Sequence, residues 1–342
     1  MCKPHFTLYF IDIVGACNLR CPSCPVGNFQ SNDFVNQSRP KGFMQLSLFE
    51  DILDKIKRED NEHEYVVIGV YNWGEPLLHP EYPKFIDAIK SRGFYAEVST
   101  NLNVKKVKDV VSFAPHKLII SLSGYHREVY AKTHSNGDAN LMVSNLYKLR
   151  YYMDKLKQNF AVEISYHLYE HNVGEDLERM MCIANDLGFH FSSELTLLMP
   201  LEKNFKYLRG EQLSELEQKL ISLMLIKPEE QLKLAQPYKN TSCSLLNWKT
   251  INFDGSMATC CAVYDYEYNI TNNFLKVSHT ELEERKRNSS LCKRCMVQGL
   301  HALATYTARD ELDKLINERL QKFGSKIIRD ASHARHYSFD FH

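Results

Sequence analysis

The sequence has no excess of either charge and no long apolar run. Its 342 residues include 42 Lys plus Arg and 42 Asp plus Glu. Proteins that hold a phosphate backbone usually carry a basic excess, so we do not expect nucleic acid as a partner. No stretch approaches the roughly 20 apolar residues that span a bilayer, so we expect no membrane association. The composition, 44% hydrophobic and 25% charged, suits one large soluble domain or a large domain with a smaller one.

The first residues also lack the features of a secretory signal. The segment FTLYFIDIVGAC, residues 6–17, superficially resembles a signal that ends in a lipoprotein cleavage site. However, a single Lys precedes it, Asp12 interrupts it, and two further cysteines follow it at once. We therefore expect a cytoplasmic protein, whose ten cysteines are metal ligands or buried thiols rather than disulfides.

Short apolar segments alternate with amphipathic ones over residues 1–226. Helical patterns such as the spacing of Met142, Leu146, Leu149 and Met153 separate six apolar segments. Six β-α units imply an α/β fold with a parallel sheet, either doubly wound or curled into a partial barrel. The predicted strands are 6–13, 65–71, 94–99, 117–122, 161–168 and 190–197.

Residues 227–300 have a different pattern, and Lys227–Pro228 is a plausible linker before them. The stretch NWKTINFDGSMATCC predicts a β-hairpin with Asp254–Gly255 at its turn, and cysteines flank it on both sides. A long helix over about 299–322 is expected next, so that residues 301–342 form a C-terminal helix and tail.

Thiol-rich or polar stretches follow the first four predicted strands: CNLRCPSC, NWGEPLLHP, STNLN and SLSGYHR. The carboxyl ends of parallel strands meet on one face, so these loops are expected to share one rim. No acid–base residue is nominated. Some ionisable side chains near the strands could contact a substrate or could be satisfied polar groups of the core. They are Asp12, Glu97, Glu163, His167 and Glu194.

The spacing C-x3-C-x2-C puts three soft ligands, Cys17, Cys21 and Cys24, on one tight loop. No fourth Cys or His lies nearby, whereas structural zinc takes four ligands in a closed tetrahedron. A disulfide would leave the third thiol unused. Three thiolates on a [4Fe–4S] cluster leave one iron open to a substrate or cofactor, which makes this the favoured interpretation.

This motif directly after the first strand resembles that of the radical S-adenosylmethionine (SAM) enzymes. The resemblance implies a partial (β/α)6 TIM-like barrel in which the open iron chelates SAM and the bound SAM yields a 5′-deoxyadenosyl radical. WGEP resembles the family's GGEP loop, and STN and the serines after the fourth strand resemble its other SAM contacts. The residues so implied are Trp73, Gly74, Glu75, Ser99, Asn101, Ser121 and Ser123.

Two positions depart from the family pattern. Trp73 stands where the first glycine of GGEP is expected, so that the loop is stiffer or the ring stacks on a neighbour. Ser23 replaces the usual aromatic residue before the third cysteine, which packs near adenine. Tyr9, Phe10 or Tyr71 could compensate for its absence.

A second group of thiols has the order Cys243, Gly255, Cys260 and Cys292-x2-Cys295. It resembles the C-terminal SPASM extension, or its shortened twitch form, and implies a small α+β domain with one auxiliary [4Fe–4S] cluster. A zinc knuckle of the same four thiols is the alternative. Cys261 could be an alternate ligand, a buried thiol or a hydrogen-atom donor, and Cys182 is expected in the core.

The resemblance favours an oxidoreductase that attacks a C–H bond of a small polar metabolite, of sugar or aminocyclitol type. The auxiliary cluster would take part in electron transfer during dehydrogenation or epimerisation. A flavodoxin or ferredoxin would supply the electron for SAM cleavage. A peptide maturase is the alternative, although only five residues precede the first strand and leave no room for the usual peptide-recognition domain. A non-catalytic iron–sulfur scaffold would not need the GEP and STN loops.

Overall fold

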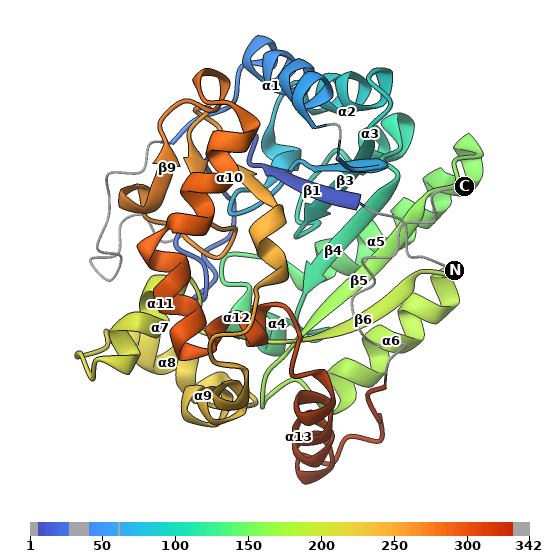
Figure 1. Cartoon of the computed structure of the whole chain (residues 1–342). Helices are drawn as coiled ribbons and strands as arrows, with labels where there is room; N and C mark the ends of the chain where they lie inside the picture. The colour runs from blue at the N-terminus through green and yellow to red at the C-terminus, as the bar shows by residue number, and fades with distance from the viewer. Residues whose placement is uncertain (1–5, 27–40, 61, 331–342) are drawn as a thin grey trace.

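A sheet in the order β6-β5-β4-β3-β2-β1-β7-β8-β9 runs through the computed structural model, which describes residues 6–26, 41–60 and 62–330. Its first six strands are parallel and curl into an open barrel (Figure 1). They are β1 (Phe6–Ile11), β2 (Tyr65–Gly69), β3 (Tyr95–Thr100), β4 (Lys117–Leu122), β5 (Ala161–Leu168) and β6 (His190–Leu195). The six predicted strands are confirmed to within two residues at each end.

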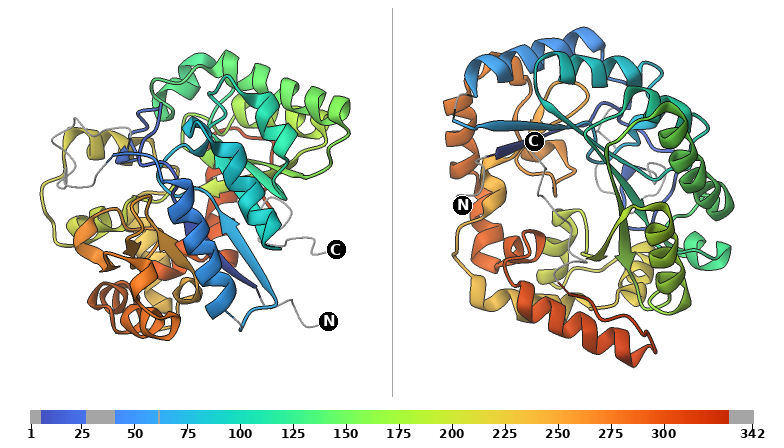
Figure 2. Two further views of the ribbon diagram at one scale, coloured as in Figure 1. Left: turned by 90° about the horizontal axis from the view of Figure 1, so that it is seen from above. Right: turned by 90° about the vertical axis from the view of Figure 1, so that its right-hand side faces the viewer.

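Helices connect these strands and cover the outside of the barrel (Figure 2). Side chains alternate across a strand, so residues such as Ile11, Ile68 and Val98 face the helices and join the main hydrophobic core. The fold is therefore a partial barrel rather than a doubly wound sheet. The helices are α1 (Leu46–Glu59), α2 (Tyr82–Ser91), α3 (Val107–Phe113), α4 (Arg127–Thr133), α5 (Ala139–Leu156) and α6 (Glu175–Leu187).

The inward positions divide the barrel interior into an apolar and a polar half. Leu8, Phe10, Val67, Tyr71 and Ile119 form an apolar cluster, mainly from β1 and β2. In the polar half, Lys117 Nζ lies 2.8 Å from Glu163 and 3.9 Å from Glu97. The Tyr71 hydroxyl also donates to Glu97, and Ser192 donates to Glu163. Glu97 and Glu163 are therefore satisfied groups of a buried charge network.

The C-terminal region continues the same sheet. The predicted hairpin is confirmed as β7 (Lys249–Ile251) and β8 (Met257–Ala258), which are antiparallel, with Gly255 at φ 82° in the turn. A third short strand is β9 (Asn269–Thr271). The parallel pairing of β7 with β1 was not predicted, and it makes the hairpin an extension of the barrel wall.

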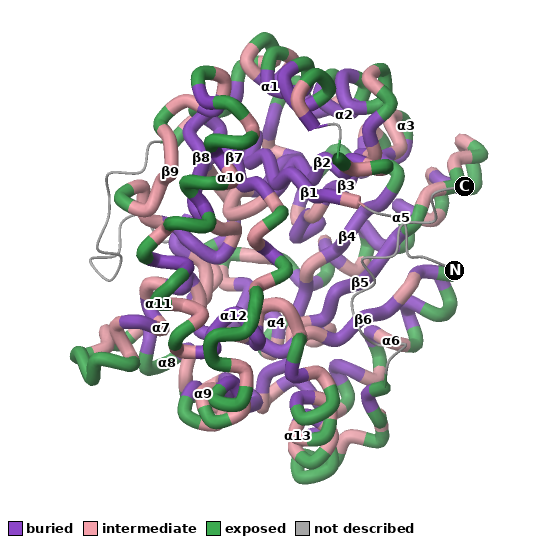
Figure 3. The backbone as a smooth tube through the Cα atoms, in the orientation of Figure 1, coloured by how far each residue is buried: buried purple, intermediate pink, exposed green. Residues whose placement is uncertain are grey.

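The remaining helices pack beside the open side of the barrel, and their outward faces are exposed (Figure 3). They are α7 (Leu201–Leu208), α8 (Glu215–Leu223), α9 (Pro228–Ala235), α10 (His279–Asn288), α11 (Ser290–Gln298), α12 (Leu300–Ala304) and α13 (Arg309–Lys322). Short 3-10 turns are η2 (Pro76–Leu78), η3 (Gln236–Tyr238), η4 (Ser244–Asn247), η5 (Tyr266–Tyr268) and η6 (Phe274–Lys276).

Three expectations for this region and its neighbours need correction. Lys227–Pro228 is the start of α9 rather than a linker, and Lys227 Nζ donates to three carbonyls at the end of α8. The single helix over 299–322 is two helices, separated at Tyr306, whose φ is 52°. Cys182 is exposed on α6 rather than in the core.

The tail beyond residue 330 lies outside the described residues. No helix in the described ranges has the length and apolarity to cross a membrane.

Candidate active site

A cavity of about 460 Å³ opens at the carboxyl ends of the barrel strands. The structure brings the four predicted loops together around it. The cavity is lined by the three clustered cysteines and six of the seven predicted SAM contacts: Cys17, Cys21, Cys24, Trp73, Gly74, Glu75, Ser99, Asn101 and Ser121.

The cysteine loop is held by the loops after β3 and α4. Asn18 donates to the carbonyl of Asn103 at 2.8 Å, and Asn136 donates to the carbonyl of Asn18 at 2.8 Å. Asn101 Nδ2 lies 3.0 Å from Asn18 Oδ1 and 3.7 Å from Cys17 Sγ. Asn101 therefore orients the first cysteine as well as lining the cavity.

The loop after β2 is fixed by Asp12, a buried residue that follows β1. Its two carboxylate oxygens accept from the backbone nitrogens of Trp73 and Gly74, each at 3.2 Å. A Cβ atom on Gly74 would lie 1.7 Å from the carbonyl oxygen of Val14, so only glycine fits there. The sequence indicated Asp12 as a possible substrate contact, but these bonds assign it to positioning the loop.

Trp73, which replaces a glycine of the family pattern, ties this loop to the C-terminal region. Its Nε1 donates to the carbonyl of Val263 at 3.0 Å, and its ring meets that of Tyr264 edge-on at 5.8 Å. The ring therefore contacts a neighbour, as expected, but edge-to-face rather than stacked.

Glu75 is 2% exposed and joins its own loop to the end of β3. Its carboxylate accepts from the hydroxyl of Thr100 at 2.8 Å, from the backbone nitrogen of Asn101 at 2.9 Å and from that of Leu77 at 3.1 Å. Burial raises the pKa of Glu75 to about 7, although these hydrogen bonds oppose the shift. The site thus holds a buried carboxyl group that a bound cation would stabilise in its ionised form.

Ser99 and Ser121 face each other across β3 and β4, with 3.2 Å between their hydroxyl oxygens. Ser123 differs from the other predicted contacts, because it lies outside the cavity lining. It is fully buried, and its hydroxyl contacts Thr133 and lies 2.7 Å from His134 Nδ1. His134 itself lines the cavity and was missed, and burial lowers its pKa to about 3, so that it is neutral.

Of the three aromatic residues that could compensate for Ser23, two are neighbours on β1, and the pleat of the strand turns them to opposite faces. Tyr9 faces outward, and its hydroxyl donates to Asp60 at 2.7 Å, which removes it from the cavity. Phe10 and Tyr71 do line the cavity, 5.4 Å apart. Tyr169 also lines it. Burial raises the pKa of Tyr169 to about 12, and hydrogen bonds with Thr196 and Ser23 oppose that shift. Sequence reasoning missed this ring because it comes from the end of β5.

The far wall of the cavity is polar. Ser165 and His167 of β5 and Glu194 of β6 line it, together with Tyr306 from the turn between α12 and α13. The Tyr306 hydroxyl donates to Glu194 at 2.8 Å and accepts from the backbone nitrogen of Leu195 at 3.0 Å, on the open edge of the sheet. Tyr306 was missed because the sequence places it inside a long helix.

The second group of cysteines gathers in two small adjoining cavities of about 30 and 50 Å³. Cys243 precedes η4, Cys260 follows β8, and Cys292 and Cys295 lie one turn apart on α11. All four line the smaller cavity, whose other walls are mostly Leu and Met. The next residue, Cys261, lines the large cavity instead. Two consecutive cysteines, Cys260 and Cys261, therefore line different cavities.

Both groups have the donor chemistry of iron–sulfur ligands. Within the described residues none of these cysteines forms a disulfide, and no three His, Cys, Asp or Glu side chains form a preformed site for one metal ion. Burial and then the charges of Glu75 and Cys24 raise the pKa of Cys17 to about 12. Burial raises the pKa of Cys292 to about 11, whereas a hydrogen bond with Cys261 lowers the pKa of Cys260. Crowded thiols become thiolates when a cationic metal core neutralises them, so both groups fit a cluster.

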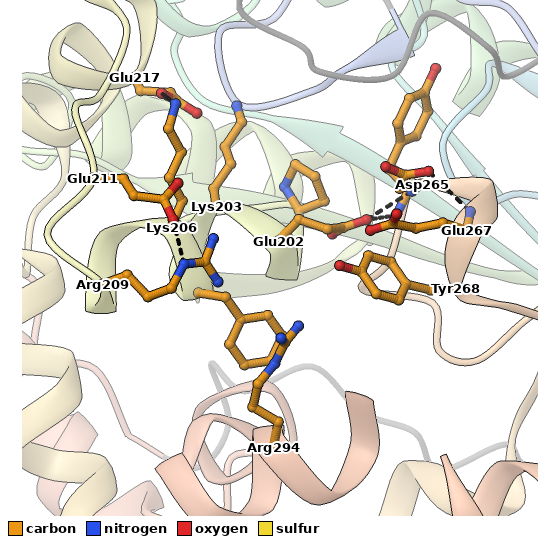
Figure 4. Close-up of a pocket in the computed structure, with 13 residues that line it drawn as sticks. Glu202, Lys203, Lys206, Arg209, Glu211, Glu217, Asp265, Glu267, Tyr268 and Arg294 are labelled. Carbon is orange, nitrogen blue, oxygen red and sulfur yellow. Dashed lines mark hydrogen bonds and ion pairs between the residues drawn. The ribbon is translucent and has the colours of Figure 1, made fainter. Parts of the chain in front are cut away.

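A third cavity, of about 250 Å³, lies on the outside between α7, η5 and α11 (Figure 4). Both signs of charge line it, and Lys206 pairs with Glu217 while Arg209 pairs with Glu211. Arg294 stacks over the ring of Phe205, 3.9 Å from its centroid. None of the predicted site residues lines this cavity.

Comparison with known proteins gives one family and one curated relative. The model of the family described as the radical SAM superfamily matches residues 11–181. The relative is a tungsten-containing aldehyde ferredoxin oxidoreductase cofactor-modifying protein from Pyrococcus furiosus, 30% identical over 92 residues. The match spans 27% of this chain and 23% of that protein.

Solved structures also resemble most of this chain, including the following two. One is anSMEcpe with bound AdoMet, with a TM-score of 0.54 and 14% identity over 93% of this chain and 100% of the other. The other is SuiB of Streptococcus suis bound to the precursor peptide SuiA, with a TM-score of 0.54 and 14% identity over 88% of this chain and 71% of the other. At these identities the likeness shows the fold alone.

Proposed function

Because the chain belongs to the radical SAM superfamily, we propose that it removes a hydrogen atom from a C–H bond of a small polar metabolite of sugar or aminocyclitol type. Membership implies a [4Fe–4S] cluster, SAM, a substrate and a reductant. Cys17, Cys21 and Cys24 would hold the cluster, which with SAM supplies a 5′-deoxyadenosyl radical. Gly74 and the Ser99–Ser121 pair would position SAM, with Asp12 fixing the loop.

The polar far wall of the large cavity is the observation that supports this substrate class. Ser165, His167, Glu194 and Tyr306 offer hydroxyl, imidazole and carboxylate groups to the cavity that the three cysteines also line. A substrate with several hydroxyl or amino groups could satisfy such a wall, whereas an apolar substrate would leave its polar groups unpaired. The curated relative is named for modifying a cofactor, which is also a small molecule.

The fate of the substrate radical would depend on the segment with Cys260 and Cys261, which lies between the large cavity and the small one. Cys243, Cys260, Cys292 and Cys295 would hold an auxiliary [4Fe–4S] cluster able to accept one electron in a dehydrogenation. Cys261, on the other side of that segment, has a thiol that could return a hydrogen atom in an epimerisation. Deuterium uptake from heavy water into an unoxidised product would identify the second outcome.

A peptide maturase is the second candidate, supported by the fold shared with SuiB, whose structure contains a precursor peptide. A scaffold without catalysis would not need a radical site with its positioning loops. In either enzymatic case the proposed electron donor is a flavodoxin or ferredoxin. The proposed compartment is the cytoplasm, where thiols stay reduced.

The test is formation of 5′-deoxyadenosine by anaerobically reconstituted full-length protein with SAM and dithionite. Polyhydroxylated and amino-substituted sugars and cyclitols, deuterated on carbon, are added singly. We expect one such compound to raise the rate at least about tenfold and to pass deuterium into 5′-deoxyadenosine. Stimulation only by a peptide encoded beside the gene would contradict the proposal and favour the second candidate.

A further inference from the structure

A buried lysine stands among the four cysteines of the second group. Lys286 lies in the last turn of α10 and is 3% exposed. It lines the same small cavity as Cys243, Cys260, Cys292 and Cys295. The positive charge of this lysine is therefore enclosed with the thiols that would hold the auxiliary cluster.

Hydrogen bonds hold Lys286 Nζ in this position. It donates to the carbonyl of Leu245 at 2.7 Å and to that of Trp248, at either end of the turn that follows Cys243. The leucines and the methionine around the cavity give a low local dielectric, in which a fixed charge acts strongly.

Three other buried lysines of the chain each have a carboxylate partner. Lys117 Nζ lies 2.8 Å from Glu163, Lys249 Nζ lies 2.8 Å from Glu283, and Lys55 contacts Glu59. The hydrogen bonds of Lys286 go to neutral carbonyls instead. Burial lowers the pKa of Lys286, and the charges of Cys260, Cys261 and Cys292 oppose that shift. The thiolates are thus the anions that compensate this cation, in the place that a carboxylate takes elsewhere.

We propose that Lys286 sets the reduction potential of the auxiliary cluster, because its fixed positive charge stabilises the additional electron of the reduced form. The inference rests on the proposed function, since it requires the second cluster. The reduction adds one electron, which in a dehydrogenation comes from the substrate radical as that radical loses a proton. Lys286 is a positioning residue for charge and contacts no substrate.

The test is a potentiometric titration of the full-length protein with both clusters reconstituted, followed by electron paramagnetic resonance. Lys286→Gln keeps a hydrogen-bond donor but removes the charge, and Lys286→Arg keeps the charge. We expect K286Q to lower the equilibrium constant for reducing the auxiliary cluster about tenfold or more, which is a shift of about 59 mV to lower potential. K286R should retain most of the wild-type potential.

The first cluster in the same molecule is the internal reference, because its potential should not move in any variant. Lys55→Met is the matched control for loss of a buried lysine. K286Q with the wild-type iron content and an unchanged auxiliary potential would overturn the inference, and so would K286R behaving like K286Q.

Iron content separates this inference from the proposed function. Two [4Fe–4S] clusters need about eight irons per chain and one needs about four. A wild-type protein with about four irons, or with zinc, would overturn the auxiliary cluster and Lys286's role together. About eight irons with an unmoved potential would overturn the role of Lys286 alone.

Discussion

The two groups of cysteines differ in how the chain assembles them and in the cavity that each group faces. Cys17, Cys21 and Cys24 lie on one loop beside a cavity of about 460 Å³. Cys243, Cys260, Cys292 and Cys295 come from separate segments and enclose about 30 Å³ between apolar walls. A large cavity leaves room for molecules to reach a metal, whereas a small apolar one admits little beyond the cluster. The contrast suits chemistry at the first group and electron transfer at the second.

Each group also has a buried ionisable neighbour, and the two have opposite charge. Glu75 lies beside the first group, where an anion favours a bound cation, and Lys286 lies beside the second, where a cation favours an electron. This difference in charge supports the different roles that we propose for the two groups of cysteines.

The largest expected effect is the loss of SAM cleavage when a cysteine of the first group is replaced. Replacing Cys17, Cys21 or Cys24 singly by Ala should reduce 5′-deoxyadenosine formation more than about 1000-fold, because the open cluster is lost. Iron content should fall only by about half, since the second group is intact. Cys182→Ala, on the exposed face of α6, is the control. Any of the three variants that still cleaves SAM would break the comparison.

Replacing a cysteine of the second group is expected to have a smaller effect on SAM cleavage. Replacing Cys292 or Cys295 by Ala should again remove about half of the iron. Substrate-free formation of 5′-deoxyadenosine should stay within about fivefold of wild type, because the described residues that line the large cavity include none from α11. Substrate turnover should be lost if the product is oxidised. The comparison fails if these variants lose SAM cleavage as completely as the first group does.

The smallest effect concerns stability and pH in the cluster-free protein. The pKa of Glu75 is raised by burial to about 7, so the folded state binds the proton more tightly than the unfolded chain. The contribution of Glu75 to the free energy of unfolding is therefore greatest below about pH 4.5. It decreases by about 3 kcal/mol as the pH rises to about 7. Glu75→Gln should remove this decrease, as measured by anaerobic urea unfolding at several pH values.

Glu128→Gln, an exposed change on α4, is the control for that measurement and should keep the wild-type pH dependence. Adding SAM should lessen the decrease, because its cationic groups favour the ionised carboxylate. An unchanged slope in Glu75→Gln would show that Glu75 is not the group responsible.

The barrel and the first cysteine loop were predictable because their signals are local. Apolar segments of period two, helical faces such as that of α5, and C-x3-C-x2-C within a short loop can be recognised without knowing what packs against them. The shared rim followed from the parallel arrangement alone. The roles of Asp12 and Ser123 could not be predicted in this way, because both depend on which neighbouring loop the side chain meets.

The sequence by itself determined the order of the six barrel strands and of the helices between them, since this order depends on local spacing and residue chemistry. Only the tertiary structure decided that β7 extends the barrel wall and that Cys260 and Cys261 face different cavities. It also brought Tyr306 to Glu194 and Lys286 to the second group of thiols. These contacts join segments far apart in the chain, and their geometry depends on the packing of the whole molecule rather than on any local pattern.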